Sequence, residues 1–188
     1  MKMNVKKLSN KKLLPTLSMS LAITTFVVMA LTILQTPQAA AASPEKIKVS
    51  REISAPVDEV WNIISNVDNE TKYWPTFKAI KNINKTDNVT EREVTLIAGP
   101  QGDTKTHQFV TVDPEEFVVE TNITEGPVTG TRLFTLTPSS DNSTTRTDVV
   151  WEIDLSGIPA IGQGFAKDGI KKTTEEALSN ITTEAEAK

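Results

Sequence analysis

The sequence predicts an α+β domain in which a curved antiparallel sheet of six to seven strands wraps around a long C-terminal helix. Two short helices are expected after the first strand. Three observations favour this fold class: apolar residues alternate with polar ones in several short segments, turn residues separate these segments at regular spacing, and the last segment changes to a helical period. A sheet with one apolar face needs a helix to cover that face.

The first 42 residues differ from the rest of the chain. They contain five lysines, all within residues 2–12, and no acidic residue. An uncharged apolar run follows, strongest from Leu21 to Leu34, and small residues occupy positions 39–43. This order is typical of a secretory signal, with cleavage after Ala41 or Ala42. An uncleaved membrane anchor is the alternative, because the apolar run is long enough to span a bilayer when it is counted from residue 13.

We therefore expect residues 1–42 to be a signal peptide or an anchor, and residues 43–188 to form one domain outside the cytoplasm. The whole chain of 188 residues has a net charge of -4. Without the leader, 15 basic and 24 acidic residues remain, a net charge of -9. Such an acidic domain is unsuited to a nucleic-acid partner, which requires a basic patch. The oligomeric state is left open by the sequence.

Six Asn-x-Ser/Thr sequons agree with a location outside the cytoplasm, where such asparagines can be glycosylated. The alternative is that a surface rich in threonine contains them by chance. The candidate glycosylation sites are Asn69, Asn84, Asn88, Asn122, Asn142 and Asn180.

Residues 46–54 begin the domain as a strand, because Ile47, Val49, Arg51 and Ile53 share one face of a period-two pattern. The pattern then becomes helical.

A short amphipathic helix is expected to follow Pro56, since proline suits the first helical turn and Asp58 and Glu59 favour the positive end of a helix dipole. A second short helix or turn is predicted over residues 67–73, before Trp74. The apolar face of the first helix has the spacing i, i+3, i+4, i+7 and consists of Val57, Val60, Trp61 and Ile64.

Strands dominate the next part of the chain. Turn residues such as Gly99–Gly102, Asp113-Pro114 and Gly126-Pro127 separate them at short intervals, as in an antiparallel meander. The expected strands are 77–85, 89–98, 103–112, 116–124, 130–137 and 145–155.

The chain ends with a helical pattern that is clear from Ile170 onward. Residues 157–169 contain four glycines, and we interpret them as a loop or a loosened first turn that leads into the helix. Only about 12 residues are strongly periodic, so this helix is expected to depend on packing against the sheet. The apolar stripe is formed by Ile170, Thr174, Ala177, Leu178 and Ile181.

Two stretches of the chain resemble a known superfamily. The first runs from Val49 through Ala55-Pro56 to Trp61 and continues to the Tyr73-Trp74-Pro75 turn, and the second is Thr145–Trp151. They are similar to the START-like superfamily, the polyketide cyclase/dehydrase and lipid-transport group, over about residues 46–183. The resemblance implies a helix-grip fold whose apolar tunnel, between the sheet and the long helix, holds a hydrophobic small molecule.

The candidate ligand-binding residues are large apolar side chains on the predicted strands and helices, with one arginine to hold the polar end of a ligand. For each apolar residue, ordinary core packing is the alternative, and for the arginine it is an ion pair on the wet face of the sheet. These candidates are Trp61, Trp74, Phe109, Phe134, Leu136, Trp151, Phe165 and Arg132.

Catalytic residues are few. His107 is the single histidine and Tyr73 the single tyrosine, so these two are weak candidates for proton transfer, with a structural role as the alternative for each. The absence of cysteine excludes disulfides and thiolate catalysis. With one histidine and no cysteine, we expect neither a transition-metal site nor a cofactor.

The sequence thus favours an exported binding module for a hydrophobic small molecule of the lipid, quinone or isoprenoid class. Its partners would be that molecule and, if the leader is uncleaved, the membrane. One alternative is an enzyme of the cyclase/dehydrase kind that uses His107 or Tyr73 in the same tunnel. Another is an envelope structural or stress protein with a filled core.

Overall fold

The computed structural model describes residues 44–97 and 102–187. The leader at residues 1–42 and most of the turn at 99–102 lie outside the described residues, so the signal or anchor stays a prediction. Within the described ranges, no helix is both long and apolar enough to cross a bilayer.

The described elements follow the predicted order: a strand, two short helices, six strands and a long helix. Their bounds are β1 (Glu45–Ile53), α1 (Val57–Ile64), η1 (Val67–Lys72), β2 (Phe77–Thr86), β3 (Val89–Ile97), β4 (Asp103–Asp113), β5 (Val118–Glu125), β6 (Thr129–Pro138), β7 (Thr145–Asp154) and α2 (Ala160–Ala185).

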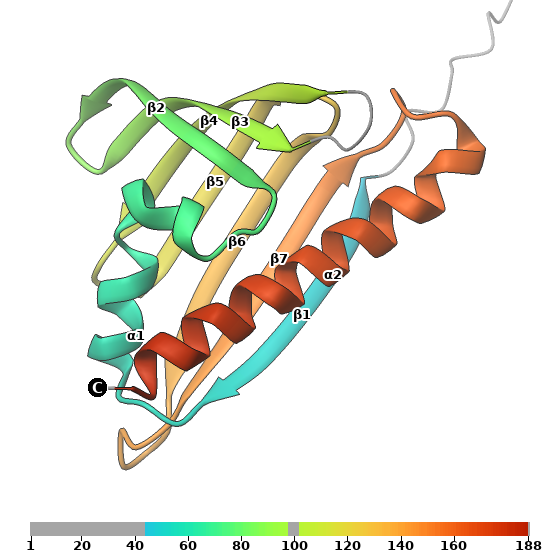
Figure 1. Ribbon diagram of the computed structural model, residues 1–188. Coiled ribbons are helices and arrows are strands. Elements are labelled where there is room, and N and C mark those ends of the chain that lie inside the picture. Colours follow the sequence, from blue (N-terminus) through green and yellow to red (C-terminus); the bar gives the residue numbers. More distant parts are fainter. Residues whose placement is uncertain (1–43, 98–101, 188) are drawn as a thin grey trace, which may run out of the picture. The chain divides into compact units, whose positions relative to one another are not determined.

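The strands form one seven-stranded sheet in the order β1-β7-β6-β5-β4-β3-β2, and every neighbouring pair is antiparallel. From β2 to β7 each strand pairs with the next one along the chain, which short turns allow. The sheet curves around α2, which runs along its concave face (Figure 1). The predicted helix-grip architecture is therefore confirmed.

The alternation of β7 shows how sequence pattern becomes core. Val149, Trp151 and Ile153 point inward and are buried, whereas their neighbours Glu152 and Asp154 are exposed. The second half of α2 covers this face with a buried stripe. The stripe consists of Thr174, Ala177, Leu178, Ile181, Thr182 and Ala185.

The start of α2 differs from the expectation. The helix begins at Ala160 and passes through the glycine-containing segment that the sequence suggested was a loop or a loosened first turn. Its first turn is held by the backbone N–H of Gly162, which donates to the carbonyl of Pro159 over 2.7 Å. The side-chain amide of Gln163 also donates to the carbonyls of Leu155 and Ile158. These local contacts outweigh the low helix propensity of glycine.

We expect Gly130→Ala to destabilise the domain by at least about 1–3 kcal/mol. Gly130 in β6 has a φ of 131°, which side chains rarely adopt, and an added Cβ would lie 2.1 Å from the carbonyl oxygen of Glu152 in β7. Urea unfolding measures the effect.

Gly157→Ala is the matched control, because a Cβ at Gly157 meets nothing within 4 Å. A similar loss of stability in both variants would contradict this account.

Candidate functional site

A cavity of about 660 Å³ lies between the sheet and the first half of α2. Most of the side chains around it are apolar or aromatic, and the polar minority is mainly threonine. Its lining comprises Trp74, Thr76, Phe77, Leu96, Ile97, Thr104, Thr106, Gln108, Thr121, Ile123, Pro127, Val128, Arg132, Trp151, Ile158, Phe165, Ala166, Gly169, Ile170 and Thr173. The volume falls within the range of about 300–1,000 Å³ that is usual for small-molecule sites.

Small residues of α2 leave room for the cavity. Phe165, Ala166, Gly169, Ile170 and Thr173 line it, and their spacing places them on one side of the helix. A Cβ added at Gly169 would meet nothing within 4 Å. The first half of α2 thus forms the roof of the cavity, while the second half packs directly onto the core.

Polar side chains from three adjacent strands lie at the base of the cavity. Thr106 and Gln108 come from β4, Thr121 from β5 and Arg132 from β6. All four are buried on the inner face of the sheet. Buried polar groups need hydrogen-bond partners, which a network behind the cavity provides.

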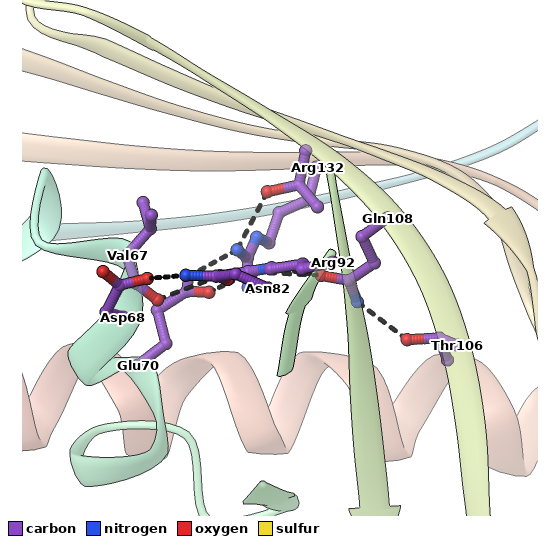
Figure 2. A network of polar contacts seen from close by, with 9 residues as sticks. Val67, Asp68, Glu70, Asn82, Arg92, Thr106, Gln108 and Arg132 are labelled. Atoms are coloured by element: carbon purple, nitrogen blue, oxygen red, sulfur yellow. Dashed lines mark hydrogen bonds and ion pairs between the residues drawn. The ribbon is translucent and has the colours of Figure 1, made fainter. Parts of the chain in front are cut away.

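The network centres on Glu70 of η1, whose carboxylate forms ion pairs with both Arg92 of β3 and Arg132 of β6. The Glu70 side chain is 8% exposed, and the two arginine side chains are 0% and 1% exposed. Figure 2 shows the η1 residues at one end of the network and Gln108 with Thr106 at the other. The ion pairs therefore attach η1 to the sheet.

The two arginines differ in how fully their donors are used. Arg92 donates from Nε and Nη2 to Gln108 Oε1 over 3.1 and 3.0 Å, and from Nη1 to the carbonyl of Val67 over 2.9 Å. Arg132 donates through Nη2 to Glu70 Oε1 and, over 3.0 Å, to Thr121 Oγ1. Its Nε is buried and has no hydrogen-bond partner among the described residues. Arg92 is thus fully engaged in structure, whereas Arg132 retains a donor.

Burial and the ion pairs act in opposite directions on the protonation of the network. Burial by itself raises the pKa of Glu70, but the Arg132 and Arg92 guanidiniums lower it below its ordinary value of 4.5. Burial lowers the pKa of Arg132, an effect that Glu70 partly offsets and Arg92 reinforces. At neutral pH we treat Glu70 as ionised and both arginines as protonated.

Four aromatic rings surround the guanidinium of Arg132. Its Cζ lies 4.6 Å from the ring centroid of Trp74, 5.4 Å from that of Phe134, 5.6 Å from that of Trp151 and 5.9 Å from that of Phe77. Cation–π attraction offsets part of the cost of burying this charge. The Trp151 indole N–H donates to Thr174 Oγ1 over 3.0 Å, which fixes its ring beneath α2.

Four of the eight residues predicted to bind ligand lie at the cavity. Trp74, Trp151 and Arg132 line it from the interior and are buried, whereas Phe165 lines it from α2 and is 79% exposed. The structure brings together side chains from the turn after η1 and from β6, β7 and α2. Their placement is compatible with a ligand site, and their role in binding stays a prediction.

The other four do not line this cavity, and their role in binding also stays a prediction: Trp61, Phe109, Phe134 and Leu136. Trp61 packs edge-on against Phe117, with ring centroids 5.5 Å apart. Phe109 lies on the outer face of β4, because its neighbours Gln108 and Val110 take the inner face. Phe134 and Leu136 are buried on the inner face of β6.

The two weak catalytic candidates also lie away from the cavity. His107 is on the outer face of β4, where its ring nitrogens contact Thr124 Oγ1 and Glu91 Oε1, each over 3.0 Å. Tyr73 is buried beside a separate void of about 10 Å³. Burial raises the pKa of Tyr73, and both a hydrogen bond with Glu184 and the negative charge of Glu184 raise it further, to about 12. Neither residue reaches the space in which a bound molecule would lie.

Glu70, Arg92 and Gln108 were missed by sequence reasoning. A signal for two of them was present: Arg92 shares a strand face with Val94, and Gln108 shares one with Val110. Polar residues on the apolar face of a strand indicate a buried network. Glu70 gave no such signal, because a six-residue helix has no clear period.

All six candidate glycosylation sites are exposed. Two of them use their side-chain amide in structure: Asn142 Oδ1 accepts from the backbone N–H of Val57 over 3.1 Å, and Asn180 Nδ2 donates to the carbonyl of Tyr73 over 2.9 Å. A glycan on Nδ2 of Asn180 would disturb the second bond, so the other five asparagines suit modification better.

A family model described as "Polyketide cyclase / dehydrase and lipid transport" matches residues 44–186. No curated protein matches the sequence. The match covers the sheet, the cavity and both halves of α2, so it includes every element that positions the site.

Solved structures of related fold are similar over 76% of this chain. A Thermus thermophilus protein has a TM-score of 0.66 at 15% identity, with 98% of its own chain covered. The Zhui aromatase/cyclase of Streptomyces has a TM-score of 0.64 at 14% sequence identity, with 93% of its own chain covered. A START superfamily protein of Mycobacterium smegmatis has a TM-score of 0.63 at 14% sequence identity, with 97% of its own chain covered. At such low identity these similarities establish the fold alone.

We expect Glu70→Gln to destabilise the domain by about 3–5 kcal/mol, because the change leaves two buried guanidiniums without their shared counter-ion. Urea unfolding at pH 7 measures the loss. The control is Glu152→Gln, which removes an exposed ion pair with Lys46 and should cost less than about 1 kcal/mol. Equal losses in the two variants would show that the network does not stabilise the fold.

Acid should weaken the same network. Since the folded-state pKa of Glu70 lies below its ordinary value, its stabilising contribution is complete above about pH 4.5 and is lost as the pH falls through the folded-state pKa. The difference in unfolding free energy between the native chain and Glu70→Gln should therefore shrink below pH 4.5. A constant difference down to pH 2 would contradict the assignment.

Proposed function

Because this chain belongs to the polyketide cyclase/dehydrase and lipid transport family, we propose that it binds a hydrophobic small molecule of the lipid, quinone or isoprenoid class beneath α2. The observation that carries the proposal is the cavity of about 660 Å³ and its predominantly apolar lining. Transfer of an apolar molecule from water into this space is favourable, at about 25 cal/mol for each Å² of apolar surface buried. The function is sequestration or transfer, with no change of covalent bonds.

The base of the cavity gives the bound molecule an orientation. Its polar groups, Thr106, Gln108, Thr121 and Arg132, lie together on β4, β5 and β6. The helix side, by contrast, presents Phe165, which is largely exposed. The polar end of a ligand would face the base, and its apolar body would fill the space beneath α2.

A binding role is supported over proton-transfer catalysis by the chemistry of the lining. Arg132 is the one titratable side chain among the described residues that line the cavity, and arginine keeps its proton at neutral pH. General acid–base catalysis needs a group that exchanges its proton near the working pH. The cavity also supports ligand binding over a purely structural role, for which a solid interior is the better arrangement.

The sequence of the leader supports a location outside the cytoplasm. The lysines of residues 2–12, the apolar run and the small residues at 39–43 together have the order of an export signal. We therefore place the ligand-binding domain in the extracytoplasmic space, secreted or held by its leader at the outer face of the membrane.

Mass measurement of the protein from its own source tests this location. A mature chain that starts at Ala42 or Ser43 is expected if the leader is cleaved, and an intact chain in the membrane fraction is expected if it is an anchor. An intact chain in the soluble cytoplasmic fraction would refute export.

A larger side chain inside the cavity should weaken binding. Ala166 lines the cavity, so Ala166→Trp is expected to weaken binding of the neutral, apolar dye Nile red at least tenfold in a fluorescence titration. The control is Asp168→Trp, which places the same side chain at an exposed position of α2 outside the lining. Circular dichroism verifies that both variants fold.

Equal dye affinity in the two variants would refute binding beneath α2. Native mass spectrometry of the protein from its source gives an independent measurement. A co-purifying apolar molecule supports the proposal, and a chain that carries none and binds no dye contradicts it.

A further inference from the structure

The network at the base of the cavity is not neutral. Arg92 and Arg132 each carry one positive charge, and their described ion pairs both end on the single carboxylate of Glu70. The three buried side chains therefore carry a net charge of +1. A buried charge without a counter-ion is costly, so this arrangement favours a negative group that enters from outside the chain.

The hydrogen bonds of the two arginines indicate which of them is less completely paired. Arg92 has Gln108, Val67 and Glu70 as partners for its three nitrogens. Arg132 bonds through Nη2 alone within the described part of the chain, and its buried Nε has no partner there. Arg132 also lines the cavity, whereas Arg92 does not. The unused donor thus belongs to the arginine that a ligand can reach.

The surroundings of Arg132 make it a poor site for water and a good one for an anion with an apolar body. Trp74, Phe77, Phe134 and Trp151 surround the guanidinium and exclude solvent from its faces. Attraction between opposite charges is strong in such a place, because the effective dielectric constant is low. Because both N–H groups of Nη2 already donate to Glu70 and Thr121, a carboxylate at this edge would accept one charge-assisted hydrogen bond, from Nε.

From this geometry we infer that the ligand is an amphipathic monocarboxylic acid whose carboxylate binds Arg132 at the base of the cavity. The inference rests on the proposed function and narrows its ligand class to acids, which excludes neutral quinones. A carboxylate brings one negative charge and neutralises the network. A phosphate monoester brings about 1.5 to 2 negative charges and would leave a buried excess of the opposite sign.

Displacement of Nile red from the full chain tests the inference with two matched probes, oleate and its methyl ester. These probes share the same apolar body and differ in charge. Oleate is expected to displace the dye at a concentration at least tenfold lower than methyl oleate does. Oleyl phosphate is expected to displace the dye less effectively than oleate, because its extra negative charge would exceed the single positive charge of the network.

The variant Arg132→Gln locates the effect. It leaves Glu70 paired with Arg92, so the buried network becomes neutral and the fold is expected to persist. The preference for oleate over its ester should fall to within about twofold. The control, Arg51→Gln, changes an exposed arginine of β1 and should leave the tenfold preference intact.

The outcomes separate the inference from the function on which it rests. Equal displacement by oleate and methyl oleate in the native chain, or tighter binding of oleyl phosphate than of oleate, overturns the inference while the binding function stands. Retention of the preference in Arg132→Gln overturns the assignment to Arg132. Failure of Nile red and of both oleyl probes to bind overturns the proposed function itself. The comparison of probes on the native chain remains decisive even if Arg132→Gln does not fold.

Discussion

The shared pairing of Glu70 with Arg92 and Arg132 is the constraint on which the site depends. It joins a short helix that follows α1 to strands β3 and β6, which are not neighbours in the sheet. The backbone carbonyl of Glu70 also accepts hydrogen bonds from the N–H groups of Tyr73 and Trp74. The ion pairs consequently fix the start of the turn that carries Trp74, whose side chain lines the cavity. Such a buried network is costly in itself, and its value lies in positioning.

The division of α2 into two halves gives the domain both stability and an interior space. From Thr174 onward, the helix packs a regular buried stripe onto the sheet. Before Thr174 the residues facing the sheet include Ala166 and Gly169, which are too small to fill the gap. Glycine lowers helix propensity, so the first half of α2 is held by its contacts at Pro159 and Gln163 more than by its own preference. The same small residues that weaken the helix make room for a ligand.

The predictability of each feature follows from the range of the interaction behind it. Alternation within β7 and the helical stripe after Ile170 are local patterns, and both appeared in the structure where the sequence indicated. The predicted start of α2 was wrong because the glycines of residues 157–169 lower helix propensity, whereas hydrogen bonds at Pro159 and from Gln163 hold the first turn in the structure. Among site residues, large aromatics were identified by size, but Phe109 and Trp61 point away from the cavity. The strand pattern placed Arg92 on the same face as Val94, but it could not indicate the partner Glu70, which lies 22 residues earlier in the chain.

The sequence by itself determined the fold family, the order of the elements and the charge contrast between the leader and the domain. These properties follow from period, turn chemistry and composition, which are written along the chain. The tertiary structure decided where the cavity lies, which aromatics reach it, and that two arginines share one carboxylate at its base. Those features depend on the curvature of the sheet and on side chains from distant segments that meet in space, and no local pattern encodes such meetings.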